Sequence, residues 1–206
     1  MNDARTGESQ VFVVRDEGLV PADRASEEVG ALGMRIFLAS LSMLFIASVM
    51  GYLVTRFRAE AWPPEGTPPM PGGLWASTLV LMLSSATIQL AVRSARLDRS
   101  RAVGPWMLVT TLLGLMFLAL QGFNWWKMGW FGFPDQAKLY AFTFYMLTGL
   151  HALHVIGGLG FLSLVTFRAF RGGYWSLHHA GVRHAAAYWH FLDGVWLILF
   201  ILLVFV

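Results

Sequence analysis

Hydrophobic residues along the chain fall into five long runs, separated by segments rich in charge, proline or glycine. Each run reaches the roughly 20 residues that an α-helix needs to cross the hydrocarbon core of a bilayer. The pattern predicts an all-α, polytopic membrane protein, with residues 30–206 forming one bundle of five transmembrane helices. The predicted spans are residues 31–54, 74–92, 104–123, 139–167 and 185–206.

The segments outside these runs have a different composition. Residues 1–29 hold seven acids and three arginines, and they lack the basic start and apolar stretch of a signal peptide. We expect a disordered cytoplasmic tail there, because so polar a segment buries too little apolar surface to fold. Residues 62–71 are rich in proline, which removes hydrogen-bond donors and predicts a stiff loop between the first two spans.

Composition supports the membrane assignment. Of the 206 residues, 56% are hydrophobic and 13% are charged, a balance that a soluble surface does not have. The chain contains no cysteine, which excludes disulfides, iron–sulfur clusters and thiolate metal sites. Its net charge of +3 comes mostly from arginines in short loops, so the charge indicates topology and not nucleic-acid binding.

The loop cations predict the orientation of the helices. Seven of them fall in the second and fourth loops and four in the first and third, which favours an N-terminus inside and a C-terminus outside. The seven are Arg93, Arg96, Arg99, Arg101, Arg168, Arg171 and Arg183, and the four are Arg56, Arg58, Lys127 and Lys138.

The few polar residues inside the spans are candidate functional residues. Asp193 is the one acid, of twelve, well inside a predicted span, and ionisable groups there are costly and by default suggest function. His151 and His154 lie one helical turn apart, as do His190 and Asp193. A short fourth loop makes the two helices antiparallel neighbours and could bring these pairs to similar depths.

We interpret these groups first as hydrogen-bonding contacts between helices, together with a set of hydroxyls and amides. That set is Ser84, Ser85, Thr87, Gln89 and Gln121. Three alternatives remain: haem ligation by histidine, a non-haem metal held by His and Asp, and a proton relay. A stand-alone transporter or b-haem membrane protein would use His151, His190 and Asp193.

Glycines indicate where helices approach closely. Gly149, Gly157, Gly158 and Gly160 leave one side of the fourth run nearly bare of side chains. Small residues of this kind permit close packing with another helix of the chain or of a partner.

Several motifs resemble one family. Residues 188–199 read Tyr-Trp-His-Phe-Leu-Asp-Gly-Val-Trp-Leu-Ile-Leu, and residues 148–158 read Thr-Gly-Leu-His-Ala-Leu-His-Val-Ile-Gly-Gly. Together with the Leu113-Gly114 to Gln121 stretch and the Ser77-Thr78 to Ser84-Ser85 stretch, they closely resemble subunit III of the haem–copper oxidases of the cytochrome c oxidase type. Five spans fit the short bacterial form of that family.

The resemblance implies a non-catalytic subunit of a respiratory oxidase in the bacterial inner membrane. The redox centres, haem and copper, would belong to partner subunits, with no metal or catalytic site in this chain. The implied partners are subunit I as the main contact, subunit II and possible further oxidase subunits. The family is also expected to bind phospholipid and to support proton and oxygen delivery during oxygen reduction.

Candidate contact residues follow from the spans and from the resemblance. For structural, proton or lipid contacts they are Arg93, Arg96, Gln121, His151, His154, Trp189, His190 and Asp193. The arginines, with His178 and His179, are expected near the inner surface, where cations pair with phosphate headgroups. Three family acids are replaced, by Leu41, Asn124 and Arg183, which puts in doubt any proton-related role of those positions.

Overall fold

A computed structural model of the protein describes residues 12–15, 18–67, 69–130, 134, 137–171 and 180–205. The elements are β1 (Phe12–Arg15), β2 (Gly18–Pro21), α1 (Ala22–Arg58), α2 (Gly73–Arg96), α3 (Ser100–Trp130), α4 (Lys138–Phe170) and α5 (Ala180–Phe205). Among these described residues, five helices are long and apolar enough to cross a membrane, which confirms the predicted polytopic all-α class. The lipid contacts predicted at His178 and His179 lie outside the described residues.

Each helix extends beyond the apolar run that predicted it, because the run marks only the part suited to hydrocarbon. At the end of α2, Arg93 and Arg96 occupy the last turn, where cations interact favourably with the helix dipole. The backbone N–H of Leu97 then bonds to the carbonyl of Arg93 at 3.0 Å. Asp98 follows in the left-handed region, with φ of 56°, a conformation that aspartate tolerates and that turns the chain into α3.

The chain divides into two compact units, Met1–Ser40 and Leu41–Val206. In the first, β1 and β2 form an antiparallel hairpin with Val13 opposite Val20 and Val14 opposite Leu19. The hairpin falls in the segment expected to be a disordered tail. Its short Phe-Val-Val run has the β-branched and aromatic residues that favour strands, a local signal that the overall charge of the segment masks.

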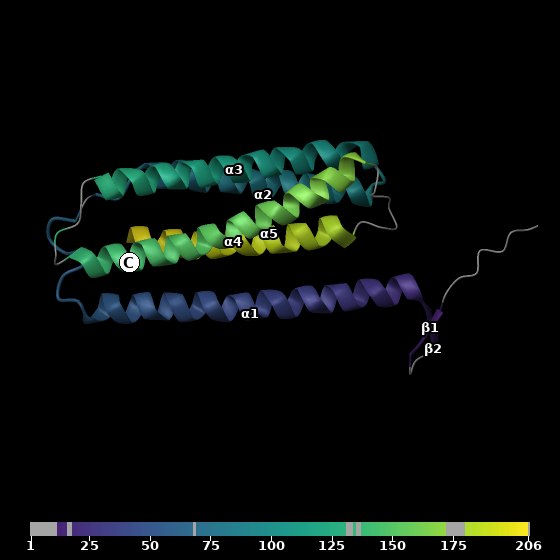
Figure 1. Ribbon diagram of the computed structural model, residues 1–206, viewed down its shortest axis with the longest axis horizontal. Helices are drawn as coiled ribbons and strands as arrows, with labels where there is room; N and C mark the ends of the chain where they lie inside the picture. Colours follow the sequence, from purple (N-terminus) through teal and green to yellow (C-terminus); the bar gives the residue numbers. More distant parts are fainter. Residues whose placement is uncertain are drawn as a thin grey trace, which may run out of the picture. The chain divides into compact units, whose positions relative to one another are not determined.

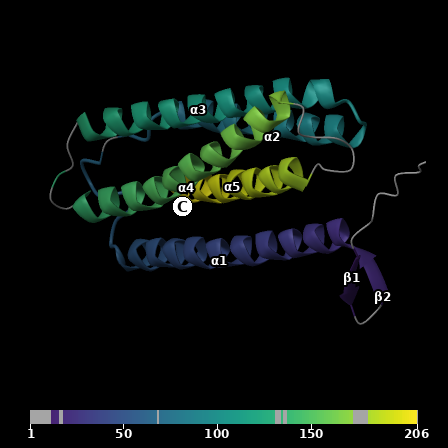
Figure 2. The same ribbon diagram turned by 45° about the vertical axis from the view of Figure 1, so that its right-hand side comes forward.

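In the second unit, helices α2 to α5 form a closed bundle (Figure 1). Close backbone approach joins α2 to α3, α3 to α4, α4 to α5, and α5 back to α2. Both views show α4 crossing obliquely while α2 and α3 run side by side (Figure 2). The largest side chains buried inside this unit include Phe117, Phe144, Trp189 and Trp196.

The part of α1 from Leu41 onward packs on this bundle through aromatic side chains. The ring of Phe45 lies 5.2 Å from that of His154. Near the C-terminal end of α1, the indole of Trp62 donates to the hydroxyl of Tyr52 at 3.3 Å and packs edge-on against Tyr140. Trp62 belongs to the proline-rich segment between α1 and α2, which lies outside the helices as predicted.

Candidate functional site

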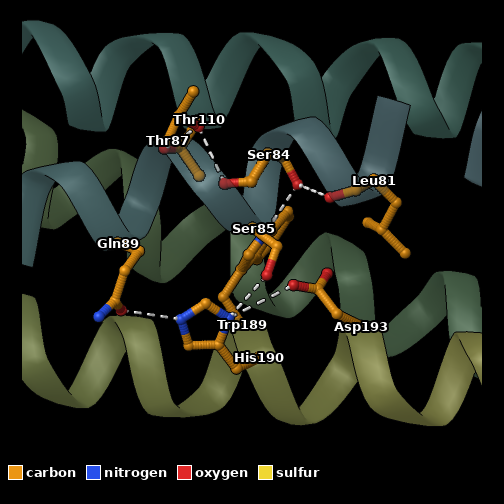
Figure 3. Close-up of polar contacts among 9 residues, drawn as sticks. All are labelled: Leu81, Ser84, Ser85, Thr87, Gln89, Thr110, Trp189, His190 and Asp193. Carbon is orange, nitrogen blue, oxygen red and sulfur yellow. Dashed lines mark hydrogen bonds and ion pairs between the residues drawn. The ribbon is translucent and has the colours of Figure 1, made fainter. Parts of the chain in front are cut away.

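Two indoles of α5 donate hydrogen bonds to hydroxyls of α2. Nε1 of Trp189 lies 3.0 Å from Oγ of Ser84, and Nε1 of Trp196 lies 3.0 Å from Oγ1 of Thr78. The Ser84 hydroxyl in turn donates to the carbonyl of Leu81 at 2.7 Å (Figure 3). A second hydrogen bond joins α2 to α3, where the hydroxyl oxygens of Thr87 and Thr110 lie 2.8 Å apart. These contacts are of the interhelical type that the sequence predicts for Ser84, Thr87 and Trp189.

His190 is the centre of a polar cluster between α2 and α5 (Figure 3). Its Nδ1 lies 2.9 Å from Oγ of Ser85 and 3.6 Å from Oδ2 of Asp193, and its Nε2 lies 3.4 Å from Oε1 of Gln89. A neutral imidazole carries one proton, so it donates either toward Gln89 or toward the Ser85 and Asp193 side, while an imidazolium donates to both.

Asp193 is almost completely buried, with a side chain 5% exposed against 39% for that of His190. Neither of its carboxylate oxygens has a hydrogen-bond partner among the residues that the structure describes. A buried carboxylate is costly unless a cation or donor compensates it. The imidazole of His190, one helical turn away, is placed to provide that compensation.

His151 and His154 have different surroundings. Nδ1 of His154 lies 2.7 Å from the carbonyl of Leu150, and the carbonyl of His154 accepts from the hydroxyl of Tyr188 at 3.0 Å. This last bond confirms that α4 and α5 are neighbours. In the described part of the chain, no hydrogen bond or ion pair joins the two histidines of α4 to His190 or Asp193.

His151 is fully buried in a cage of aromatic rings. The centre of its ring lies 5.1 Å from the ring centre of Trp196, 6.0 Å from that of Phe117 and 6.3 Å from that of Phe45. Neither ring nitrogen has a hydrogen-bond partner within the described ranges. The sequence shows that this histidine is inside a span, but the aromatic cage depends on three other helices and could not be read from spacing.

Two amides of α3 are also buried. Gln121, expected to make contacts between helices, has no hydrogen-bond partner for either amide atom within the part of the chain described, and neither has Nδ2 of Asn124. Asn124 packs directly on Gly73 at the start of α2, where an added Cβ would clash with its amide oxygen. Sequence reasoning identified Asn124 only as a position where the resemblance leads one to expect an acid, because its contact with Gly73 depends on how α2 and α3 pack.

The remaining candidates lie apart from these clusters. Arg93 and Arg96 are exposed in the last turn of α2. Leu41, which the resemblance predicts to stand in place of an acid, is buried within α1, as an aliphatic side chain can be without a polar partner.

No group of three or more His, Cys, Asp or Glu side chains is placed to hold a metal ion within the described residues. The His151 imidazole is enclosed by aromatic rings, and Nδ1 of His154 lies against a backbone carbonyl.

A family model described as cytochrome c oxidase subunit III matches residues 23–206, which includes α1 from its second residue, the whole of α2 to α5 and every polar contact described above. The chain belongs to the cytochrome c oxidase subunit III family. It is 35% identical to cytochrome c oxidase subunit 3 of Thermostichus vulcanus over 187 residues, covering 89% of this chain and 92% of that protein.

Further relatives agree. The chain is 36% identical to cytochrome c oxidase subunit 3 of a Synechocystis strain, over 82% of this chain and 72% of that protein. It is 33% identical to a probable cytochrome c oxidase subunit 3 of Nocardia farcinica, over 85% and 87% of the two chains. The protein is therefore a subunit III of a haem–copper oxidase, a multi-pass membrane protein that associates with other oxidase subunits.

Proposed function

We propose that this subunit III packs beside subunit I of a respiratory terminal oxidase, with subunit II and further subunits as additional partners. In this role it binds phospholipid and supports proton and oxygen delivery during oxygen reduction, while haem and copper reside in the partner subunits. The observation that carries the proposal is the family match over residues 23–206.

The polar contacts fit a supporting role. Trp189 and Trp196 tie α5 to α2, and Tyr188 ties α5 to α4, so the hydrogen-bonding side chains of α5 are largely used to hold the bundle together. His151, a residue of the alternative transporter or b-haem interpretation, lies in an aromatic cage. The oxidase interpretation is therefore the one that we retain.

The outer surface suits lipid and partner helices. Large apolar side chains are exposed on several helices, among them Leu79, Leu112, Leu153 and Ile198. Arg93 and Arg96 lie at one end of α2, where they could pair with phosphate headgroups. The loop cations support an N-terminus inside, and the bacterial inner membrane is the location that this proposal includes.

Purification of a tagged chain from its own membranes tests the proposal. In mild detergent we expect subunits I and II to co-purify and the sample to show a haem Soret band. The tagged chain expressed alone should show no such band, because the proposal assigns haem to the partner subunits. A Soret band in the isolated chain would contradict the supporting role, and a chain that purifies without any oxidase subunit would overturn the proposal.

A further inference from the structure

Two exposed side chains of α2, four residues apart, have unused hydrogen-bond donors. The amide oxygen of Gln89 lies 3.4 Å from Nε2 of His190, and Figure 3 shows the amide nitrogen on the side away from that ring. The guanidinium of Arg93 has no ion pair or hydrogen bond among the residues that the structure describes. Residues four apart share one face of a helix, so the amide and the guanidinium lie one above the other on the surface of the bundle.

Helix α5 borders this face with one polar and one small side chain. The side chain of His190 is 39% exposed, and Ala187, one turn earlier, is exposed and presents only a methyl group. The hydrogen bonds between the two helices make α5 antiparallel to α2, so Ala187 lies on the side of His190 that faces the end of α2. We call Gln89, Arg93, Ala187 and His190 the α2/α5 surface site.

The α2/α5 surface site lies at the edge of the hydrocarbon. The second apolar run ends at residue 92, so Gln89 is three residues, or about 5 Å, inside that edge, and Arg93 is the first residue beyond it. The fifth run begins at residue 185, which puts His190 five residues, or about 8 Å, inside. The two donors of α2 therefore face the layer in which the polar parts of lipids meet their acyl chains.

The spacing of these donors matches the polar part of a phospholipid. The headgroup and interfacial region adds about 5–8 Å to each side of the hydrocarbon core. Within this layer the phosphate is outermost, and the ester carbonyls that join the acyl chains to glycerol lie next to the hydrocarbon. Arg93 and Gln89 are separated by about 6 Å along the helix axis. A phosphate beside the guanidinium therefore places an ester carbonyl at the level of the amide.

The chemistry of this face favours a ligand that accepts hydrogen bonds and carries negative charge. A guanidinium is a donor without acceptor capacity, and the amide nitrogen of glutamine offers two N–H donors. Phosphate and ester oxygens accept hydrogen bonds and donate none. The positive charge of Arg93, without a partner among the described residues, is complementary to a phosphate, and cations near the membrane surface attract anionic lipids.

We propose that the α2/α5 surface site binds one ester-linked phospholipid, with its phosphate on the guanidinium of Arg93 and an ester carbonyl on the amide nitrogen of Gln89. The inference rests on the proposed function, which assigns phospholipid binding to the assembled subunit. It adds the place of one lipid and the linkage that the site recognises. The acyl chain would pass the methyl group of Ala187, which lets a lipid approach the amide.

A pair of lipids that differ only in linkage tests the site. Diacyl phosphatidylglycerol has ester carbonyls, whereas dialkyl phosphatidylglycerol has the same phosphate and headgroup but ether oxygens without carbonyls. The assembled complex, with a benzophenone amino acid at Ala187, is delipidated and reloaded with an equimolar mixture of the two. Mass spectrometry of the photo-adducts then gives the ratio of ester to ether lipid at this position alone.

The variants should change this ratio in different ways. In the otherwise wild-type complex we expect the ester lipid to be favoured by about 3- to 15-fold, the effect of one hydrogen bond within a membrane. Gln89→Met should bring the ratio close to one. Arg93→Ala should lower both adducts by about fivefold and keep the ratio, because both lipids have the phosphate. The matched control is Leu90→Met, an exposed apolar neighbour that should leave the ratio and the yield unchanged.

The ratio is measured within one folded, assembled sample, so a less stable variant does not imitate loss of the preference. Equal ester and ether adducts without the substitutions, or a preference that survives Gln89→Met, would overturn the inference. Adducts with another protein subunit in place of lipid would also overturn it, since a partner helix would then cover the site. In each case co-purification with the oxidase subunits keeps the proposed function intact. Failure of the wild-type chain to co-purify with any of them would instead overturn the proposed function, and with it this inference.

Discussion

The indole of Trp189 in α5 and the hydroxyl of Ser84 in α2 form a buried hydrogen bond of 3.0 Å across 105 positions of sequence. Trp189 is 1% exposed and Ser84 is 0% exposed, so water cannot replace either partner. The Ser84 hydroxyl also donates to Leu81, which makes it donor and acceptor at once. The contact therefore fixes both the distance and the register between α2 and α5.

Ser84→Ala should destabilise the chain by about 1–3 kcal/mol, because it leaves the buried indole N–H without a partner. Trp189→Phe removes the donor as well, so the double variant should lose less than the sum of the two single variants. We expect a coupling of about 0.5–1.5 kcal/mol in a double-mutant cycle of unfolding in mild detergent. Ser48→Ala is the control, since among the described residues that exposed hydroxyl bonds to a carbonyl of its own helix. Additive effects would mean that the indole finds another acceptor.

Gly158 and Gly157 should respond oppositely to substitution, although they are adjacent. A Cβ atom at Gly158 would lie 2.9 Å from the ring of Tyr188, whereas one at Gly157 would meet nothing within 4 Å. We expect Gly158→Ala to destabilise the bundle by about 1–3 kcal/mol through overpacking. Gly157→Ala should be neutral or stabilise by up to about 1 kcal/mol through higher helix propensity. Thermal unfolding of both variants tests this, and equal losses would show that Gly157 also packs against a neighbour.

The glycine pair shows how far sequence reasoning could go. The run of glycines predicted close packing on α4, and the structure confirms it at Gly158. The sequence could not distinguish Gly158 from Gly149, Gly157 and Gly160, which face open space. Which glycine packs against a neighbour depends on how α4 is rotated relative to α5. Helix periodicity fixes which residues share a face but not which face meets a neighbour.

For the polar residues, the sequence predicted positions along the helices but not their partners on other helices. The number of spans, and the position of His190 and Asp193 on one helix face, followed from hydrophobic runs and spacing. The partners on α2 did not, because Ser85 and Gln89 are separated from His190 by about half the chain. The hairpin of β1 and β2 was missed for a different reason, since its four-residue strands are too short to show a pattern above the surrounding charge.

His151→Phe should be tolerated. The imidazole makes only ring contacts with the described residues, and replacing a buried polar group by an apolar one of similar shape is close to neutral. In mild detergent, we expect the free energy of unfolding to change by less than about 1.5 kcal/mol. The visible spectrum of the assembled complex should be unaltered. His151→Ala is the comparison, and it should cost more because it leaves a cavity. A large loss with phenylalanine would indicate that the ring nitrogens hold a water molecule or a partner group.

Arg93→Ala should lower the amount of phospholipid that the complex retains during delipidation. An arginine near an anionic membrane surface contributes about 1 kcal/mol, which corresponds to roughly fivefold weaker retention. Arg58→Ala is the control, because Arg58 belongs to the set of loop cations predicted on the outer side. Phosphorus analysis of both variants over a detergent titration provides the measurement. Equal retention in Arg93→Ala and wild type would remove this residue from the lipid contacts.

Asp193 allows a structural role to be distinguished from a proton-relay role. Its carboxylate is buried beside the imidazole of His190, with Oδ2 at 3.6 Å from Nδ1. Asp193→Asn keeps the shape and a hydrogen-bonding amide, whereas Asp193→Leu removes both charge and acceptor. If the carboxylate holds α5 in place through His190, the Asn variant should assemble almost normally. The Leu variant should assemble poorly, because the imidazole of His190 loses the carboxylate that lies 3.6 Å from its Nδ1.

A relay predicts a different pair of results, since proton transfer requires a group that can ionise. Both variants would then assemble, and both would slow oxygen reduction per assembled complex. The measurement is therefore twofold: the yield of complex that contains this chain, and the turnover of that complex. His190→Gln is the matched control, because it retains hydrogen bonding but cannot become an imidazolium, and under the structural role it should behave like Asp193→Asn. An Asp193→Asn complex that forms in full yield yet turns over slowly would rule out the structural role as the main one.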